Sequence, residues 1–393
     1  DLDQFARVYT PIVFTIALAI ALLPPLLFGG NWHDWVYKAL VLLVIACPCA
    51  LVISTPVTIV SGLAAAARHG ILIKGGTYLE KGHKLTWLAL DKTGTITYGQ
   101  PIQTDFELLG DLAVADCLRL AASLAGRSDH PVSQAVVNAS KTQGIIHASV
   151  NDFEALLGRG VRGVINGKAY CLGNHRLVHE LNRCSIALEA RLDELERQGK
   201  TVIMLFDDSQ VLALFAVADT VKDSSRAAIK DLHRLGIKTI MLTGDNPHTA
   251  EAIAQQVGID QGRGNQLPED KLRVVETLST EGTIGMVGDG INDAPALARA
   301  HIGFAMGAMG TDTAIETADV ALMDDDLRKI PTFIRLSQAT RSVLIQNITL
   351  ALGIKIVFLI LTLMGFGTMW MAVFADVGAS LLVVGNGLRL LRK

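Results

Sequence analysis

Four apolar stretches, two near each end of the chain, limit what this sequence can fold into. They span roughly residues 11–28, 39–66, 343–364 and 369–388, and each is long enough to cross the hydrocarbon core of a bilayer as a helix. The chain is 50% hydrophobic, which is high for a protein that works entirely in water. We therefore expect a membrane part built from four helices, with a polar region of different character between the two pairs.

The charges that flank these stretches predict their orientation. The short loop between the first two stretches and the short loop between the last two fall on the same side of the membrane. Basic residues gather on the other side, which the positive-inside rule assigns to the cytoplasm. These residues are Arg68, Lys74, Arg389, Arg392 and Lys393.

Composition and chain start exclude several classes of protein. The net charge of -3 and the lack of a basic stripe argue against a nucleic-acid partner. Five cysteines, an odd number of which three are scattered singly, argue against a disulfide framework. The chain begins at Asp1 without the pattern of a signal peptide. We expect it to be a fragment of a longer protein.

The region from about 70 to 330 alternates β-branched runs with helical patterns. Such alternation predicts a parallel sheet with helices on its faces. Inside it, Asn166 and Gly167 stand between alternating residues and predict a hairpin. The β-branched runs lie at 87–91, 238–245, 282–289, 301–306 and 319–323.

This pattern predicts a membrane α-helical bundle joined to a cytoplasmic α/β part that is interrupted by an inserted α+β unit. The expected domains are two membrane helices over 1–69, an α/β domain over 70–104 and 206–335, an insert over 105–205, and two membrane helices over 336–393.

Carboxylates follow three of the predicted strands. Asp91 ends the apolar run of "LALDKTGTIT", while "TGDN" and "GDGINDAP" follow two other runs. Reactive groups of open α/β sheets gather at the carboxyl ends of strands, and a carboxylate there can attack a phosphoryl group. Clustered carboxylates also suit Mg²⁺, and Lys271 of "PEDK" offers a point charge for phosphate.

In this order and spacing, "DKTGTIT", "TGDN", "PEDK" and "GDGINDAP" resemble the phosphorylation domain of P-type ATPases, which has a haloacid-dehalogenase-like fold. The resemblance implies that ATP phosphorylates Asp91 and that Mg²⁺ is the cofactor. It further implies roles for residues that hold phosphate (Lys92, Thr93, Thr243 and Lys271), that bind Mg²⁺ (Asp91, Thr93 and Asp289) and that complete the site (Asn292 and Asp293). An Asp-x-x-Lys element near the hinge to the insert is formed by Asp219 and Lys222, and Asp219 is expected to bind cofactor.

The insert resembles the nucleotide-binding domain of heavy-metal-transporting members. These carry Ser-x-His-Pro and a Gly-x-Gly loop, which implies ATP contacts by His130, Gly158, Gly160 and Asn174. The family usually has Glu where this chain has Ala125, so we expect weaker nucleotide affinity. "GRGVRG" also fits a dinucleotide fingerprint, but that motif requires a helix after it, whereas "VINGKAY" continues as a hairpin.

Polar groups in the apolar stretches predict a lined ion site. Cys47 and Cys49 flank a proline, which breaks helical hydrogen bonding and is tolerated in a membrane where the backbone lines a cavity. Thiolates are soft metal ligands. Lys355 and Asp376 are costly at membrane depth, and we expect them to pair.

Cys-Pro-Cys together with Lys355 and the Asp-x-Gly that begins at Asp376 resembles the zinc/cadmium/lead-exporting class of P-type ATPases. Copper exporters would instead be expected to show Tyr-Asn in the penultimate helix and Met-x-x-Ser-Ser in the last, and neither motif is present in the sequence. The resemblance implies ATP-driven export of Zn²⁺, Cd²⁺ or Pb²⁺ across the plasma (inner) membrane. Its Thr-Gly-Glu actuator domain is not found in this sequence and is expected N-terminal to Asp1. The alternatives are a membrane-tethered phosphatase of the dehalogenase superfamily, a copper exporter, and a metal-binding membrane protein with a degenerate ATPase domain.

Overall fold

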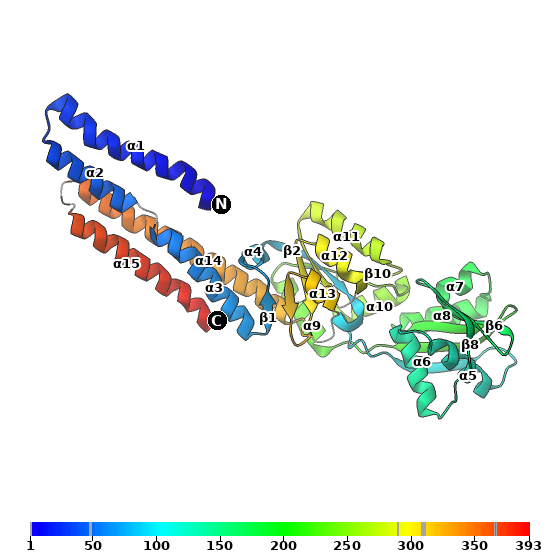
Figure 1. Cartoon of the computed structure of the whole chain (residues 1–393). Coiled ribbons are helices and arrows are strands. Elements are labelled where there is room, and N and C mark those ends of the chain that lie inside the picture. Colours follow the sequence, from blue (N-terminus) through cyan, green and yellow to red (C-terminus); the bar gives the residue numbers. More distant parts are fainter. Residues whose placement is uncertain (1, 47–48, 289–290, 308–311, 365, 367) are drawn as a thin grey trace. The chain divides into compact units, whose positions relative to one another are not determined.

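The computed structural model describes residues 2–46, 49–288, 291–307, 312–364, 366 and 368–393 (Figure 1). The chain divides into two compact units. A helical unit comprises the residues up to 69, residues 73–83 and the residues from 333 onward. A second unit, which holds the sheets, comprises residues 70–72 and 84–332.

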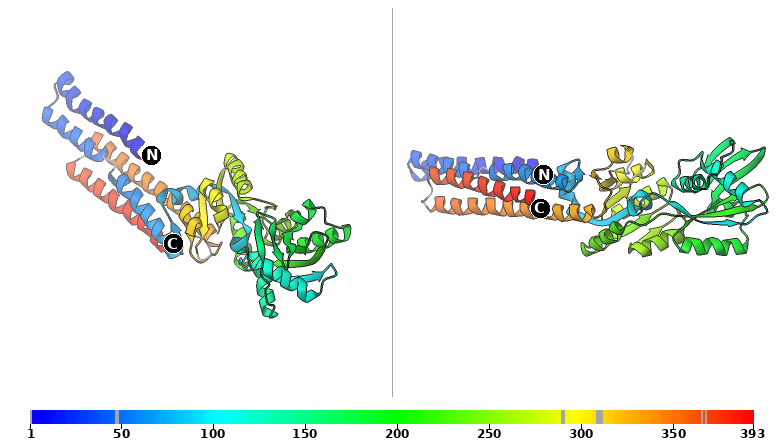
Figure 2. Two further views of the ribbon diagram at one scale, coloured as in Figure 1. Left: turned by 45° about the vertical axis from the view of Figure 1, so that its right-hand side comes forward. Right: turned by 90° about the horizontal axis from the view of Figure 1, so that it is seen from below.

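Long apolar helices make up the helical unit (Figure 2). Within the described residues, three are long and apolar enough to cross a membrane, over Pro11–Phe28, Lys329–Thr362 and Met369–Arg392, and Val52–Arg68 is a shorter apolar helix. The helices are α1 (Leu2–Phe28), α2 (Trp32–Ala46), α3 (Cys49–Arg68), α4 (Gly76–Lys81), α14 (Lys329–Leu363, of which the part from Phe333 belongs here) and α15 (Met369–Leu388).

The expected apolar stretch 39–66 is shared between two helices. Helix α2 ends at Ala46 and α3 begins at Cys49. A helix usually ends before a proline, because the proline ring clashes with the preceding turn and its nitrogen has no hydrogen to donate. Residues 47–48, with the predicted ligand Cys47, lie outside the described residues.

Small side chains and one polar network hold the helical unit together. Ala50 of α3 packs with Ala351 of α14 and Ala379 of α15, which is typical of close contact between membrane helices. The buried Asn347 amide of α14 donates hydrogen bonds to Ser54 Oγ at 2.8 Å and to the Val383 carbonyl at 3.1 Å. These contacts connect α3, α14 and α15.

The predicted parallel sheet is present in the second unit and contains all five predicted strands. Its order is β1-β13-β12-β11-β2-β9-β10, and the β13-β12, β12-β11, β11-β2, β2-β9 and β9-β10 pairs are parallel. The strands are β1 (Ile71–Ile73), β2 (Leu85–Asp91), β9 (Lys238–Leu242), β10 (Gln261–Arg263), β11 (Thr283–Gly288), β12 (Ile302–Met306) and β13 (Val320–Leu322).

Strand β2 is buried on both faces, as the run "WLALD" predicts. On one face Trp87 and Ala89 pack with Val275 and Leu278 of α11 (Pro268–Glu281). On the other face Leu88 and Leu90 are fully buried. Burial on both faces is the reason a parallel strand reads as a continuous apolar run. Helices α9 (Asp223–Arg234), α10 (Pro247–Val257), α12 (Ala294–Arg299) and α13 (Asp312–Thr317) complete this part of the unit.

The second sheet of this unit is antiparallel, with the order β3-β8-β7-β6-β5-β4. Helices α5 (Val114–Ala125) and α6 (Pro131–Thr142) pack on one face, and α7 (His175–Glu180) and α8 (Ile186–Arg197) on the other. The strands are β3 (Ile102–Leu108), β4 (Asn151–Leu156), β5 (Gly160–Ile165), β6 (Lys168–Asn174), β7 (Thr201–Phe206) and β8 (Val211–Ala218).

The hairpin predicted from Asn166 and Gly167 is confirmed. Ile165 pairs with Lys168, and the two turn residues have φ angles of 51° and 78°. Positive φ at both central residues is what a two-residue hairpin of matching twist requires.

The antiparallel sheet extends beyond the expected insert of 105–205. It begins with β3 at Ile102 and includes β8, which ends at Ala218. A turn after β7 brings β8 back alongside it, because Asp207 Oδ1 accepts hydrogen bonds from the backbone N–H groups of Ser209 and Gln210.

Candidate functional site

Asp91, the predicted nucleophile, lies at the carboxyl end of β2, between β9 and β11. The Lys271 ammonium at the start of α11 is 2.5 Å from Asp91 Oδ1 and 2.7 Å from Asp293 Oδ1. All three side chains are buried. The structure thus brings together three predicted site residues that come from three separate motifs.

The two carboxylates keep Lys271 charged in a buried place. Burial by itself lowers the pKa of Lys271, but the negative charges of Asp91 and Asp293 outweigh this effect and raise the pKa above its ordinary value. An ammonium group therefore stands beside Asp91 at neutral pH. Such a fixed positive charge stabilises the negative charge of a transferring phosphoryl group.

A second ion pair joins Lys92 to Asp245, whose atoms Nζ and Oδ2 are 2.5 Å apart. Thr243 Oγ1 also donates to this carboxylate at 3.0 Å, and Thr201 Oγ1 of β7 donates at 2.8 Å. Burial opposes both charges, yet the pair raises the pKa of Lys92 and lowers that of Asp245. The motifs assign no role to Asp245, although it lies in "TGDN" two residues after Thr243.

The loop after Asp91 is held from outside by the Asp-x-x-Lys element. The Lys222 ammonium donates to the Gly94 carbonyl at 2.8 Å, and Asp219 Oδ2 accepts from Thr97 Oγ1 at 2.5 Å and from the Gly99 N–H at 3.2 Å. Gly94 has a φ of 73°, a conformation that favours glycine. Asp219, expected to bind cofactor, therefore holds the shape of the loop that follows Asp91.

The other predicted residues of this site are less enclosed. Thr93 is half-buried in an extended conformation within the loop, and Asn292 is exposed next to Asp293. The predicted Mg²⁺ ligand Asp289 lies outside the described residues. Nearby, Asp219 Oδ1 and the hydroxyl of Thr95 are buried and have no hydrogen-bond partner among the residues that the structure describes.

His130 immediately precedes helix α6 and caps its N-terminus. Its Nδ1 atom accepts a hydrogen bond from the Val132 N–H at 3.3 Å, and Pro131 is the first helical residue. Because Nδ1 is an acceptor, the neutral ring carries its proton on Nε2, which can donate. The charges of Asp245 and Lys92 both act on the imidazole. This predicted nucleotide residue is thus within electrostatic reach of Lys92 and Asp245.

The predicted glycine loop begins β5. Gly158 has a φ of 67° and Gly160 a φ of 143°. A Cβ atom on Gly160 would stand 2.2 Å from the Leu172 carbonyl oxygen, so only glycine fits there. Asn174 supports this loop, since its Nδ2 donates to the Gly158 carbonyl at 2.9 Å while its Oδ1 accepts from the Leu177 N–H.

The structure also places Ala125 and the predicted residues of the transported-ion site. Ala125, which replaces the usual Glu, is fully buried in the core between α5 and the antiparallel sheet. In the helical unit, the expected pairing of Lys355 with Asp376 is confirmed, because Nζ and Oδ1 are 3.3 Å apart. Cys49 is the first residue of α3.

Comparisons with known proteins identify relatives of this chain. Haloacid dehalogenase-like hydrolases match residues 85–301. A cadmium-transporting ATPase of Staphylococcus aureus is 46% identical over 99% of this chain and 55% of its own length. A zinc/cadmium/lead-transporting P-type ATPase of Escherichia coli is 44% identical over 100% of this chain and 53% of its own length. The chain thus spans about half the length of the curated relatives it matches.

Solved structures are similar across both units. The crystal structure of a zinc-transporting PIB-type ATPase in the E2.Pi state matches with a TM-score of 0.77 and 44% identity, over 99% of this chain and 64% of that one. The catalytic domain of a CPx-ATPase matches with a TM-score of 0.56 and 30% identity, over 68% of this chain and 96% of that one.

Proposed function

This chain belongs to the haloacid dehalogenase-like hydrolases and to the zinc/cadmium/lead class of heavy-metal P-type ATPases, and on this premise we propose that its parent protein exports divalent soft metal ions. ATP drives the export through an aspartyl-phosphate on Asp91. The observation that carries the proposal is the buried contact of Asp91 with the Lys271 ammonium at 2.5 Å. With its apolar helices, the protein is an integral membrane protein.

Asp91 is the nucleophile. One of its carboxylate oxygens attacks the γ-phosphorus of ATP, and the bond from that phosphorus to the β–γ bridging oxygen breaks, which releases ADP. Lys271 offsets the charge that develops on the phosphoryl oxygens, while Lys92 and Thr243 hold phosphate beside the loop. Asn292 and Asp293 complete the site. Water later hydrolyses the aspartyl-phosphate, so the carboxylate is regenerated.

The residues around Asp91 fit Mg²⁺. The carboxylate of Asp91 is a hard oxygen group of the kind that this ion prefers, and so are Asp219 Oδ1 and the Thr95 hydroxyl, which are buried without a hydrogen-bond partner in the described part of the chain. We assign Asp91, Thr93 and Asp289 to the ion. When bound, it neutralises negative charge on the transferring phosphoryl group.

Nucleotide binding belongs to the antiparallel sheet and its helices. We assign the ATP contacts to His130 through Nε2 and to the backbone around Gly158 and Gly160, with Asn174 keeping that loop in shape. Asp219 supports the hinge between the two sheets. The insert that binds nucleotide corresponds to the sheet from Ile102 to Ala218.

The transported ion is the cargo, and we assign its site to Cys47, Cys49, Asp376 and Lys355. Thiolates and one carboxylate make a mixed set that suits Zn²⁺, Cd²⁺ and Pb²⁺. Lys355 is 3.3 Å from Asp376, so its ammonium can balance that carboxylate when no ion is bound. The remaining partners are the lipid bilayer and an actuator domain that precedes this chain. We place the protein in the plasma (inner) membrane, with its sheets in the cytoplasm.

A phosphorylation assay tests this function on the full-length protein. Zn²⁺, Cd²⁺ and Pb²⁺ should each stimulate acid-stable labelling by ATP that carries a radioactive γ-phosphate, and Cu⁺ should not. Asp91→Asn should abolish the label, whereas Asp208→Asn, at an exposed turn, should keep it. Labelling of the Asp91→Asn protein would refute the mechanism.

A further inference from the structure

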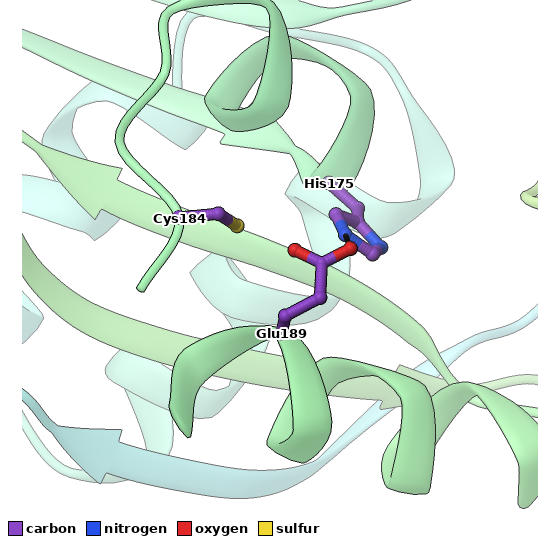
Figure 3. A group of neighbouring side chains, drawn as sticks. All are labelled: His175, Cys184 and Glu189. Carbon is purple, nitrogen blue, oxygen red and sulfur yellow. Dashed lines mark hydrogen bonds and ion pairs between the residues drawn. The ribbon is translucent and has the colours of Figure 1, made fainter. Parts of the chain in front are cut away.

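Three potential metal ligands face one another on the side of the antiparallel sheet covered by α7 and α8 (Figure 3). His175 is the first residue of α7, Cys184 lies in the loop before α8, and Glu189 lies in the first turn of α8. We call these residues the His175 cluster. No part of the phosphorylation mechanism uses it.

The atoms of the His175 cluster already converge. The imidazole, the thiol and the carboxylate each offer one atom, and these atoms lie within 4.8 Å of one another. His175 Nε2 is 3.0 Å from Glu189 Oε1, and the Cys184 sulfur lies within 4.8 Å of both ligand atoms. Ligands of a tetrahedral Zn²⁺ ion at about 2.0–2.3 Å stand roughly 3.5 Å apart. Side-chain shifts of about 1 Å would therefore complete the geometry.

Glu196 orients the imidazole from behind. Its carboxylate oxygen is 3.1 Å from His175 Nδ1, and its side chain is only 2% exposed. A histidine that binds a metal through one ring nitrogen commonly donates the hydrogen of the other nitrogen to a carboxylate, which fixes the tautomer and the ring. Glu196 occupies that place, so Nε2 is directed at Cys184 and Glu189.

We propose that His175, Cys184 and Glu189 bind a divalent ion of the Zn²⁺ or Cd²⁺ class, as a second metal site apart from the membrane cysteines. One thiolate, one imidazole and one carboxylate suit such ions, and a water molecule can fill the fourth position. The Cys184 thiol and the Nε2 position of His175, which faces Glu189 in the metal-free protein, each lose a proton to solvent when the ion binds.

A different set of ligands competes with this one. His175, Asp193 and Glu196 also bring their ligand atoms within 4.8 Å of one another, and Glu196 lies beside Nδ1 of the ring. That set has no thiol and would take the imidazole through Nδ1. The thiol therefore distinguishes the two sets, since only the His175 cluster gives a thiolate–metal bond.

Cd²⁺ binding to the full chain tests the proposal. Cys47→Ser and Cys49→Ser are introduced together, so that the membrane thiols cannot contribute, and cadmium chloride is titrated while the ultraviolet thiolate-to-Cd²⁺ charge-transfer band is recorded. We expect a band that saturates at one ion per chain and that excess Zn²⁺ removes. The measurement involves neither ATP nor transport. A negative result would therefore refute the second metal site without affecting the proposed export function, and loss of phosphorylation would not affect the second metal site.

Variants in the same background identify the ligands. Cys184→Ser should abolish the band, while Cys171→Ser, a half-buried thiol on β6, should leave it unchanged. Glu189→Gln, at a side chain 38% exposed, should keep the fold by circular dichroism and lower Cd²⁺ affinity at least tenfold. Glu196→Gln should weaken affinity about 10–100-fold without changing the stoichiometry.

Three results would overturn the proposal. They are the absence of a band in the background chain, a band that survives Cys184→Ser, and unchanged Cd²⁺ affinity in a folded Glu189→Gln chain.

Discussion

Lys271 forms ion pairs with two buried carboxylates. Its ammonium lies 2.5 Å from Asp91 and 2.7 Å from Asp293, and all three groups are removed from water. Removing one member of a buried charge network leaves the others without compensation, which destabilises a protein far more than the loss of an exposed pair. Lys271 therefore matters for stability and, in the mechanism that we propose, for phosphoryl transfer.

Lys271→Met should lose most phosphorylation by ATP and lower the free energy of unfolding by about 3–5 kcal/mol. Acid-stable labelling and urea unfolding of the detergent-solubilised chain measure the two effects. Lys230→Met removes an exposed lysine of α9 and should change neither. Equal labelling of the two variants would show that Lys271 takes no part in phosphoryl transfer.

At the scale of single elements, the turn between β7 and β8 depends on one carboxylate. Asp207 is 2% exposed and lies 2.6 Å from the Lys168 ammonium, and it accepts hydrogen bonds from Ser209 and Gln210. Burial by itself would raise the pKa of Asp207, but these partners outweigh it and hold the pKa well below its usual range. This turn returns the chain to form the β7–β8 pair, from which Thr201 reaches Asp245.

Asp207→Ala should lower the free energy of unfolding at pH 7 by about 1–3 kcal/mol. A carboxyl group with a depressed folded-state pKa stabilises the fold above its unfolded value of about 3.9, and this contribution disappears as the pH falls through the folded value. The difference between the variant and the unaltered chain should therefore shrink below about pH 4. Urea unfolding across this pH range measures it, and a difference independent of pH would contradict the ion-pair explanation.

At the scale of the whole molecule, the apolar helices contain a pair of opposite charges. Lys355 of α14 and Asp376 of α15 lie 3.3 Å apart, and both side chains are largely buried. A lone charge at membrane depth is costly. Each residue therefore makes the other tolerable, while Asp376 also carries the ligand role that we propose for the cargo.

Lys355→Met and Asp376→Asn should each lower the thermal stability of the detergent-solubilised protein, because each leaves one charge unpaired. The double variant should recover stability, since no charge remains, but should not recover Cd²⁺-stimulated phosphorylation of the full-length protein. Thermal unfolding and phosphoenzyme labelling separate the two effects. A double variant as unstable as the single ones would argue against the ion pair.

Much of the fold could be predicted because its signals are local. Apolar runs such as "WLALD" became buried parallel strands, and Asn166-Gly167 became a two-residue turn. The extent of the antiparallel sheet was not predictable to the same degree, because β3 and β8 pair across about a hundred residues of chain. Hydropathy predicts one apolar segment over 39–66, where the structure has α2 and α3, because hydropathy does not register where a helix ends.

The sequence by itself determined which chemical groups stand at strand ends and in what order, because motifs and hydrophobic periods are properties of neighbouring residues. Only the tertiary structure decided which groups meet. Lys271 reaches Asp91 across 180 positions, Lys92 takes Asp245 as its partner, and His175 meets Cys184 and Glu189. Such contacts depend on how helices and strands pack in three dimensions, and the spacing of residues along the chain does not encode them.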